Sequence, residues 1–223
     1  MCTRTGTTMR IGLVGGTGKE GSGLGLRWAK SGHQVMLGSR SAERALQKAN
    51  ELSAQSGLCL QGGSNIKAIA ESELVVVCVP YQAHKATFEL VGQHCKHDPI
   101  VVDLTVPLKP PKVRRVQLPV GQSAALEAAK ILGDNVRLVA GFHHVSSTHL
   151  ANLDHPIECD VLICSDHKDA RQTVIELVSD LGTRGLDAGV LANSIALESL
   201  TPLLIHMNIK YKSSGTGIRI TGL

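Results

Sequence analysis

The first hundred residues alternate short apolar runs with longer amphipathic stretches. The apolar runs have the length of buried strands, and the stretches between them repeat apolar positions every three or four residues, as surface helices do. Strands are expected at 10–14, 34–38, 58–61, 74–79 and 100–104. Helices are expected between them at 18–31, 42–54, 65–71 and 81–94. This alternation predicts βαβ units and a parallel sheet.

The second half of the chain continues the pattern less regularly. Strands are expected at 136–142, 160–164 and 184–187, and helices at 123–132, 168–181 and 191–207. The segment 106–119 mixes prolines with lysines and arginines, so it is expected to be a long exposed loop. The tail 213–223 has glycines at short intervals and is expected to be irregular.

The composition narrows the class of protein. Hydrophobic residues make up 43% of the chain and charged residues 19%, which excludes a disordered protein. Aromatic residues are 2%, so the core must consist of aliphatic side chains, and stacking platforms for nucleic acid are not expected. The formal charge of +4 comes without dense basic runs, and no apolar stretch is long enough to cross a bilayer. The predicted partners are therefore small molecules, with neither nucleic acid nor a membrane.

The cysteines give an expectation about the compartment. They are scattered without a C-x-x-C pair, and Cys59, Cys78 and Cys164 lie within apolar runs. We therefore expect reduced thiols in a cytoplasmic protein.

The turn after the first predicted strand has the spacing of a dinucleotide-binding site. Gly16, Gly18 and Gly21 complete a G-x-G-x-x-G pattern between a strand and a helix. In this position, the first two glycines permit the turn and the close approach of a pyrophosphate, and the third permits close packing of helix and strand. Thr17, Lys19 and Glu20, which lie between the glycines, are assigned to cofactor binding with them. A glycine-rich turn without a ligand is the alternative interpretation.

The end of the second predicted strand indicates which nucleotide is bound. An acidic residue there would bind the ribose hydroxyls of NAD and repel the ribose phosphate of NADP. This strand is instead followed by Ser39 and Arg40, with Arg44 one helical turn further on. A hydroxyl and guanidinium groups suit a phosphate dianion, so NADP(H) is the predicted cofactor. Solvated arginines at a helix start are the alternative.

These features predict an α/β protein with a Rossmann-type, doubly wound, mostly parallel sheet and a smaller C-terminal α/β part. Residues 1–8 are expected to be a flexible extension, and 9–142 the NADP-binding domain. Residues 143–223 are expected to form this smaller part and to carry a dimer interface.

With these residues assembled, the chain resembles the F420-dependent NADP oxidoreductases. The resemblance runs nearly from end to end. It rests on 11–21 (IGLVGGTGKEG), Gly32-His33, Gly38-Ser39-Arg40, Val79-Pro80, His143, 151–154 (ANLD), 186–189 (LDAG), Asn193-Ser194 and 198–203 (ESLTPL). The later motifs are more particular to this family than the opening glycines.

The resemblance implies hydride transfer between NADP(H) and the deazaflavin coenzyme F420, in an acceptor cleft that residues 143–223 complete. It implies that Val79, Pro80 and Tyr81 line the cofactor side of the cleft, with His144 beside the rings and Thr216 on the C-terminal side. His143 and Val145 are assigned to the catalytic centre. No strong acid or base is needed, because the cofactors carry the chemistry.

Two alternative functions remain open. The acceptor can instead be FMN, FAD or a metal chelate, or the protein can be an NADP(H)-binding redox sensor without turnover. A metal site is not expected, because the histidines at 143, 144, 149 and 155 lack further ligands at a recognised spacing.

Two further segments carry expectations. The basic loop (Lys109, Lys112, Arg114 and Arg115) is interpreted as a solvated surface, with steering of an anionic cofactor tail as the alternative. The final helix is apolar nearly all round, which predicts burial and a homodimer interface along it.

Overall fold

The computed structural model describes residues 8–96 and 98–223. Most of the expected N-terminal extension, with Cys2, lies outside the described residues. Among the described helices, none combines the length and apolarity needed to cross a bilayer.

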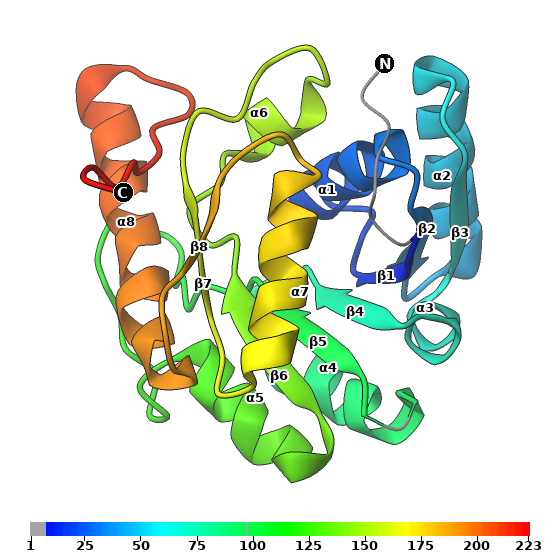
Figure 1. Cartoon of the computed structure of the whole chain (residues 1–223), viewed down its shortest axis with the longest axis horizontal. Coiled ribbons are helices and arrows are strands. Elements are labelled where there is room, and N and C mark those ends of the chain that lie inside the picture. Colours follow the sequence, from blue (N-terminus) through cyan, green and yellow to red (C-terminus); the bar gives the residue numbers. More distant parts are fainter. Residues whose placement is uncertain (1–7, 97) are drawn as a thin grey trace.

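An eight-stranded sheet forms the centre of the described chain (Figure 1). Its strands are β1 (Arg10–Val14), β2 (Gln34–Ser39), β3 (Leu60–Ser64), β4 (Leu74–Val77), β5 (Ile100–Asp103), β6 (Arg137–Gly141), β7 (Val161–Cys164) and β8 (Gly185–Asp187). The strand order is β3-β2-β1-β4-β5-β6-β7-β8. Neighbouring strands are parallel except for the antiparallel pair β6 and β7. This is the predicted doubly wound α/β sheet.

Helices cover both faces of the sheet (Figure 1). They are α1 (Lys19–Lys30), α2 (Ala42–Ser56), α3 (Asn65–Glu71), α4 (Tyr81–His94), α5 (Ala124–Leu132), α6 (Ser147–Ala151), α7 (Lys168–Ser179) and α8 (Ser194–Tyr211). Short 3₁₀ turns at Gly133–Asn135 and Leu191–Asn193 precede β6 and α8.

The core is divided by the sheet into two apolar clusters. One cluster contains side chains of α1, α2 and α7, and the other contains side chains of α4, α5 and α8. Successive residues of β4 alternate between them, with Leu74 and Val76 in the first and Val75 and Val77 in the second. A fully apolar strand such as LVVV is stable because both of its faces are covered.

Three elements differ from the sequence-based expectation. The third strand lies at Leu60–Ser64 instead of 58–61, and it includes Gly62 and Gly63, which have low strand propensity. Gly62 is needed there because a Cβ would lie 2.4 Å from the carbonyl oxygen of Ala45 in α2. The short helix α6 was not expected, and the last α-helix begins at Ser194 and continues to Tyr211.

The final helix is not buried all round, contrary to the expectation. Leu197 and Leu204 are buried against the body of the protein, whereas Leu203 is 50% and Met207 41% exposed. The apolar residues of α8 therefore lie on two faces of the helix, one buried against the protein and the other exposed on its surface.

The topology brings several loops to one edge of the sheet. Parallel strands β1 to β6 all end at this edge, which we call the carboxyl edge. Because β7 is antiparallel to β6, it begins at the same edge. The glycine turn after β1, the end of β2, the β4–α4 junction and the segment 142–160 therefore lie along a single side, where ligands bind in open α/β sheets.

Candidate functional site

The glycine turn after β1 is tightly fixed by the backbone. Gly15 has a φ of 72°, which favours glycine. The N–H of Gly16 donates to the carbonyl oxygens of Leu13 and Gly38, both at 3.0 Å. A Cβ on Gly21 would lie 2.7 Å from the Cα of Gly16, so helix α1 packs directly on the turn. The sequence-based roles of Gly16 and Gly21 thus have a geometric basis.

The start of α1 is open to a ligand. Gly18 is the N-cap residue and gives the helix no side-chain cap. A Cβ at Gly18 would have the carbonyl oxygen of Gly15 as its nearest neighbour, at 3.7 Å, so this side of the turn is unobstructed. Uncapped N–H groups in the first turn of a helix attract anions. The turn therefore fits the pyrophosphate of a dinucleotide.

The three residues between the glycines differ in exposure. Lys19 is exposed, whereas Thr17 and Glu20 are half-buried. Loss of hydration raises the pKa of Glu20 to about 7. An acid that titrates close to neutral pH therefore stands in the helix turn that faces the proposed anion.

A serine and two arginines lie at and just after the end of β2. Ser39 is buried, and its hydroxyl accepts the N–H of Ser41 at 3.4 Å. Ser41 caps α2 by accepting the N–H of Arg44 at 3.2 Å. The guanidinium groups of Arg40 and Arg44 are exposed and have no carboxylate partner among the described residues. This arrangement fits a ribose phosphate.

The β4–α4 junction supplies the residues predicted on the cofactor side. Val79 is half-buried, and the exposed Pro80 is the N-cap residue of α4. The hydroxyl of Tyr81 donates to Oε2 of Glu127 in α5 at 2.8 Å. Burial and the nearby Glu127 raise the pKa of Tyr81 to about 12, so the phenol stays protonated at neutral pH. Tyr81 therefore tethers α4 to α5.

His143 follows β6 on a strained stretch of backbone. Phe142, directly before it, has a φ of 66°, a conformation that is unfavourable for an aromatic residue. The hydroxyl of Thr201 in α8 donates to the carbonyl oxygen of His143 at 2.6 Å and fixes its position. Backbone strain of this kind persists where the surrounding structure holds the residue in a single conformation.

The imidazole of His143 is buried without a partner. It is 4% exposed, and neither ring nitrogen has a hydrogen-bond partner within residues 8–96 and 98–223. Loss of hydration lowers its pKa to about 4, although the carboxylate of Asp103 acts in the opposite direction. Buried polar atoms without partners are rare in proteins and mark ligand sites. At neutral pH, an uncharged imidazole with free nitrogens therefore stands at the carboxyl edge.

The neighbours of His143 are held by the C-terminal part of the chain. Nε2 of His144 donates to the carbonyl oxygen of Asp160 at 2.9 Å, while its Nδ1 is buried without a partner. Val145 is buried in the core cluster that contains the side chains of α1. Thr216 lies along α8, where its N–H donates to Oδ1 of Asn208 and its hydroxyl to the carbonyl oxygen of Leu204.

Sequence reasoning did not find two buried polar pairs near this edge. Nε2 of His84 in α4 lies 3.0 Å from Oδ2 of Asp103 at the end of β5. Glu198 of α8 accepts the N–H groups of Ala124 and Ala125 at 2.7 and 3.0 Å and so caps α5. The sequence signal for Glu198 was its place in the motif 198–203, although the motif does not reveal its partner.

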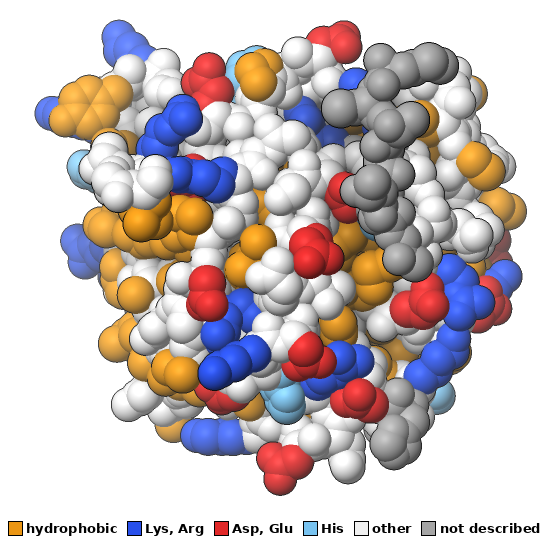
Figure 2. Space-filling model, in the orientation of Figure 1, with side chains coloured by type: hydrophobic (Ala, Val, Ile, Leu, Met, Phe, Trp, Pro, Cys, Tyr) orange, Lys and Arg blue, Asp and Glu red, His pale blue; other side chains and the backbone are white. Residues whose placement is uncertain are grey.

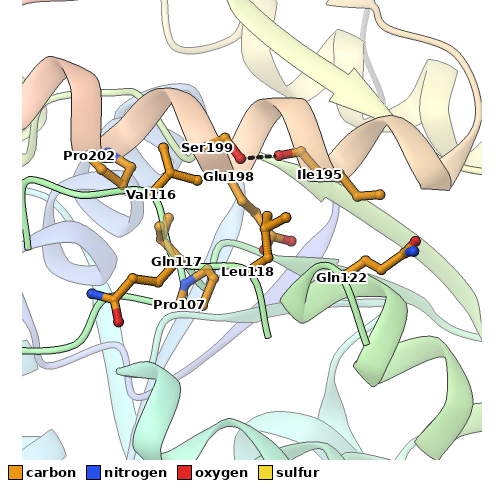
Figure 3. Close-up of a pocket in the computed structure, with 10 residues that line it drawn as sticks. Pro107, Val116, Gln117, Leu118, Gln122, Ile195, Glu198, Ser199 and Pro202 are labelled. Carbon is orange, nitrogen blue, oxygen red and sulfur yellow. Dashed lines mark hydrogen bonds between the residues drawn. The ribbon is translucent and has the colours of Figure 1, made fainter. Parts of the chain in front are cut away.

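A small pocket separates α8 from the chain segment that follows β5 (Figure 3). Val116 and Leu118 lie next to the helix, and the side chain of Glu198 extends from α8 toward this segment (Figure 3). Loss of hydration raises the pKa of Glu198 to about 8. Pro202 lines the same pocket, next to the Thr201 that binds His143. The pocket therefore adjoins the His143 segment.

Comparisons with known proteins identify relatives of this chain. A family model described as coenzyme F420-dependent NADP oxidoreductase matches residues 10–107. The chain is 40% identical to an F420-dependent NADP reductase of Methanothermobacter marburgensis, with 96% of this chain and 99% of the relative covered. An F420-dependent NADP reductase of Methanocaldococcus jannaschii is 38% identical over the same shares of the two chains.

One solved structure shares the fold over nearly its whole length. It is described as a putative F420-dependent NADP-reductase from an Arthrobacter species, and it aligns with a TM-score of 0.82 at 19% identity. The alignment covers 96% of this chain and 99% of that one. The sheet and its helices are therefore an architecture that occurs in known proteins.

Proposed function

Because this chain belongs to the F420-dependent NADP reductase family, we propose that it transfers a hydride between NADP(H) and coenzyme F420. The observation that carries this proposal is similarity over 96% of the chain. That length includes the nucleotide-binding half as well as the segment around His143.

The proposed NADP(H) site lies on the first three strands. Backbone N–H groups at the start of α1, with the side chains of Thr17 and Lys19, hold the pyrophosphate. Ser39, Arg40 and Arg44 hold the ribose phosphate. The support for this assignment is the open face at Gly18 and the two cations without carboxylate partners.

The proposed acceptor site lies where the C-terminal part, residues 143–223, meets the nucleotide-binding part. The bound cofactors supply the carbon that gives the hydride and the carbon that takes it. The task of the chain is then to orient the rings and exclude water. Pro80 and Tyr81 line the nucleotide side, and His143, His144 and Val145 lie on the acceptor side, with Thr216 behind them.

His143 is proposed as a hydrogen-bond donor to the acceptor. Its pKa of about 4 makes the imidazole neutral through the physiological range. A neutral imidazole with both nitrogens unpartnered gains a hydrogen bond when a polar cofactor edge reaches it. This gain orients the acceptor without adding a charge beside the rings.

We also propose a homodimer formed through α8. Leu203, Met207 and Tyr211 follow one another at four-residue intervals and are exposed, so they form a stripe on one face of the helix. Figure 2 shows hydrophobic side chains gathered on the left of the view, over α8. A second copy presents the same stripe, so a two-fold pairing buries both. The proposed location is the cytoplasm, and the partners are small-molecule cofactors.

The test is an anaerobic absorbance experiment with NADPH and purified coenzyme F420. We expect the visible absorbance of the deazaflavin to disappear as NADPH is oxidised, and no comparable oxidation of NADPH with FMN, FAD or a ferric chelate. The proposal fails if these alternative acceptors are reduced rapidly and coenzyme F420 is not. It also fails if NADPH binds tightly and no acceptor is reduced.

A further inference from the structure

Asn65 lies beside the proposed nucleotide site, although no sequence motif singles it out. It is the first residue of α3 and directly follows β3. β3 is the neighbour of β2, and the last residues of these two strands, Ser64 and Ser39, are paired in register. Asn65 is therefore one residue beyond the strand end that lies next to the proposed ribose-phosphate site.

The side chain of Asn65 reaches across β2 to the glycine turn. Its Oδ1 accepts the N–H of Gly15 at 3.1 Å. A backbone N–H can only donate, so this contact fixes which side of the amide is the oxygen. The Nδ2 group must then point away from the turn, and it has no hydrogen-bond partner among the described residues.

The same side chain explains the glycine at the end of β2. A Cβ on Gly38 would lie 2.9 Å from Oδ1 of Asn65. The carbonyl oxygen of Gly38 accepts the N–H of Gly16 at 3.0 Å. Asn65 therefore rests on the Cα of Gly38 and joins the ends of β1, β2 and β3 into one unit.

The unit formed by the ends of β1, β2 and β3 contains two parts of the proposed nucleotide site. In dinucleotide-binding folds the pyrophosphate lies on the glycine turn, and the adenine-side ribose is bound by the residue at the end of the second strand. Asn65 contacts the first of these places through Gly15, and it directly follows Ser64, which pairs with Ser39 at the second. It is neutral, and the open donor Nδ2 faces away from the turn.

We propose that Asn65 is a positioning residue for the glycine turn and a determinant of NADP(H) selectivity. Its Oδ1 holds Gly15 in the left-handed conformation, and its neutral, donor-bearing amide tolerates the ribose phosphate. An aspartate at this position keeps the acceptor for Gly15 and adds a negative charge where the phosphate binds. This inference rests on the proposed NADP(H) site.

The first test is Asn65→Asp, with binding of NADPH and NADH measured by calorimetry at low ionic strength. We expect NADPH affinity to fall about tenfold or more, because like charges then face each other at close range. NADH affinity should change by less than about threefold, because it lacks the ribose phosphate and the turn is retained. The matched control is Asn50→Asp, which adds the same charge on an exposed position of α2 and should change neither affinity.

The second test is Asn65→Ala, which removes the acceptor for Gly15 without adding charge. Both nucleotides should lose affinity by a similar factor of about two to ten, because the turn is no longer held in the binding conformation. Circular dichroism and the melting temperature establish that each variant is folded. If Asn65→Ala binds both nucleotides like the wild type, the positioning role is wrong.

The outcomes separate this inference from the proposed function. If the wild type does not prefer NADPH over NADH, the proposed NADP(H) site itself is wrong. If the wild type prefers NADPH and Asn65→Asp retains the full preference, the selectivity role of Asn65 is wrong. Equal losses for NADPH and NADH in Asn65→Asp also contradict the selectivity role.

Discussion

At the scale of single residues, Arg40 is the sharpest probe of nucleotide choice. It is exposed at the end of β2 and has no carboxylate partner among the described residues. A charge-assisted hydrogen bond contributes about 1.5–3 kcal/mol, so Arg40→Ala should weaken NADPH binding about tenfold to a hundredfold. NADH binding should be nearly unchanged, and calorimetry measures both. Lys48→Ala, which removes a half-buried cation further along α2, is the control. An equal loss for the two nucleotides would contradict the assignment.

Gly18 and Gly21 separate binding from folding. Gly18→Ala places a methyl group in open space, 3.7 Å from the nearest atom of the protein, so the melting temperature should stay the same while NADPH affinity falls strongly. Gly21→Ala places it 2.7 Å from the Cα of Gly16, so the protein itself should be destabilised. Thermal unfolding and calorimetry of the two variants distinguish these effects. Normal NADPH binding by a folded Gly18→Ala protein would place the nucleotide elsewhere.

Glu20 predicts a pH dependence of nucleotide binding. Its pKa of about 7 means that it loses its proton as the pH rises through neutrality. The resulting carboxylate repels the pyrophosphate, so affinity should fall with rising pH. Glu20→Gln should bind NADPH like the wild type near pH 6 and about threefold to tenfold more tightly near pH 8.5. Comparing the two proteins at each pH removes the titration of the nucleotide from the result. Identical pH profiles would contradict this role.

At the scale of elements, Glu198 joins α8 to α5. Its folded-state pKa of about 8 lies above the ordinary value of 4.5 for a glutamate, so the native protein holds a proton that the unfolded chain loses. Its contribution to stability is therefore complete at acid pH and is lost as the pH rises from about 4.5 to 8. We expect the free energy of unfolding to fall by about 2–4 kcal/mol over this range.

Glu198→Gln provides the comparison for this prediction, because the amide is neutral at every pH. The variant should show a flatter dependence of stability on pH in denaturant titrations. Identical pH profiles for the wild type and Glu198→Gln would contradict the prediction, because any change that the two proteins share comes from other groups.

Elements with strong periodicity were predictable from the sequence, and their boundaries were nearly correct. β4 and β5 are apolar runs, and α2 has a serine cap and a left-handed Gly57 at its end. The prediction for the third strand was shifted along the chain, because Gly62 and Gly63 have low strand propensity. These glycines are explained by close packing, which the sequence pattern does not show. The five residues of α6 are too few to show a helical period.

The candidate site was predictable where it depends on residues adjacent in sequence. The glycine turn and Ser39-Arg40 are of this kind. The contacts of Asn65 with Gly15, of Thr201 with His143 and of Glu198 with α5 join residues that are far apart in the chain. No local pattern specifies such pairs, because they depend on the order of strands in the sheet.

At the scale of the whole molecule, the apolar stripe on α8 predicts the oligomeric state. The double substitution Leu203→Glu with Met207→Glu should convert a dimer to a monomer, because it places charges in the proposed two-fold contact. Lys210→Glu changes charge on the same helix without removing apolar area and is the control. Sedimentation velocity measures all three proteins. A monomeric wild type, or a double variant that stays dimeric, would contradict the interface.

Because β7 runs antiparallel to β6, the segment between them and the nucleotide-binding strands can accumulate substitutions separately in evolution. The segment 142–160 leaves the sheet and returns to it at the carboxyl edge, and it carries His143, His144 and Val145. We expect substitutions there to alter the proposed acceptor side and to leave unchanged the strands that hold the glycine turn. Related proteins that use other electron acceptors can therefore diverge in the segment 142–160 while their nucleotide-binding parts stay alike. The same segment is the one to exchange when a different acceptor is wanted by design.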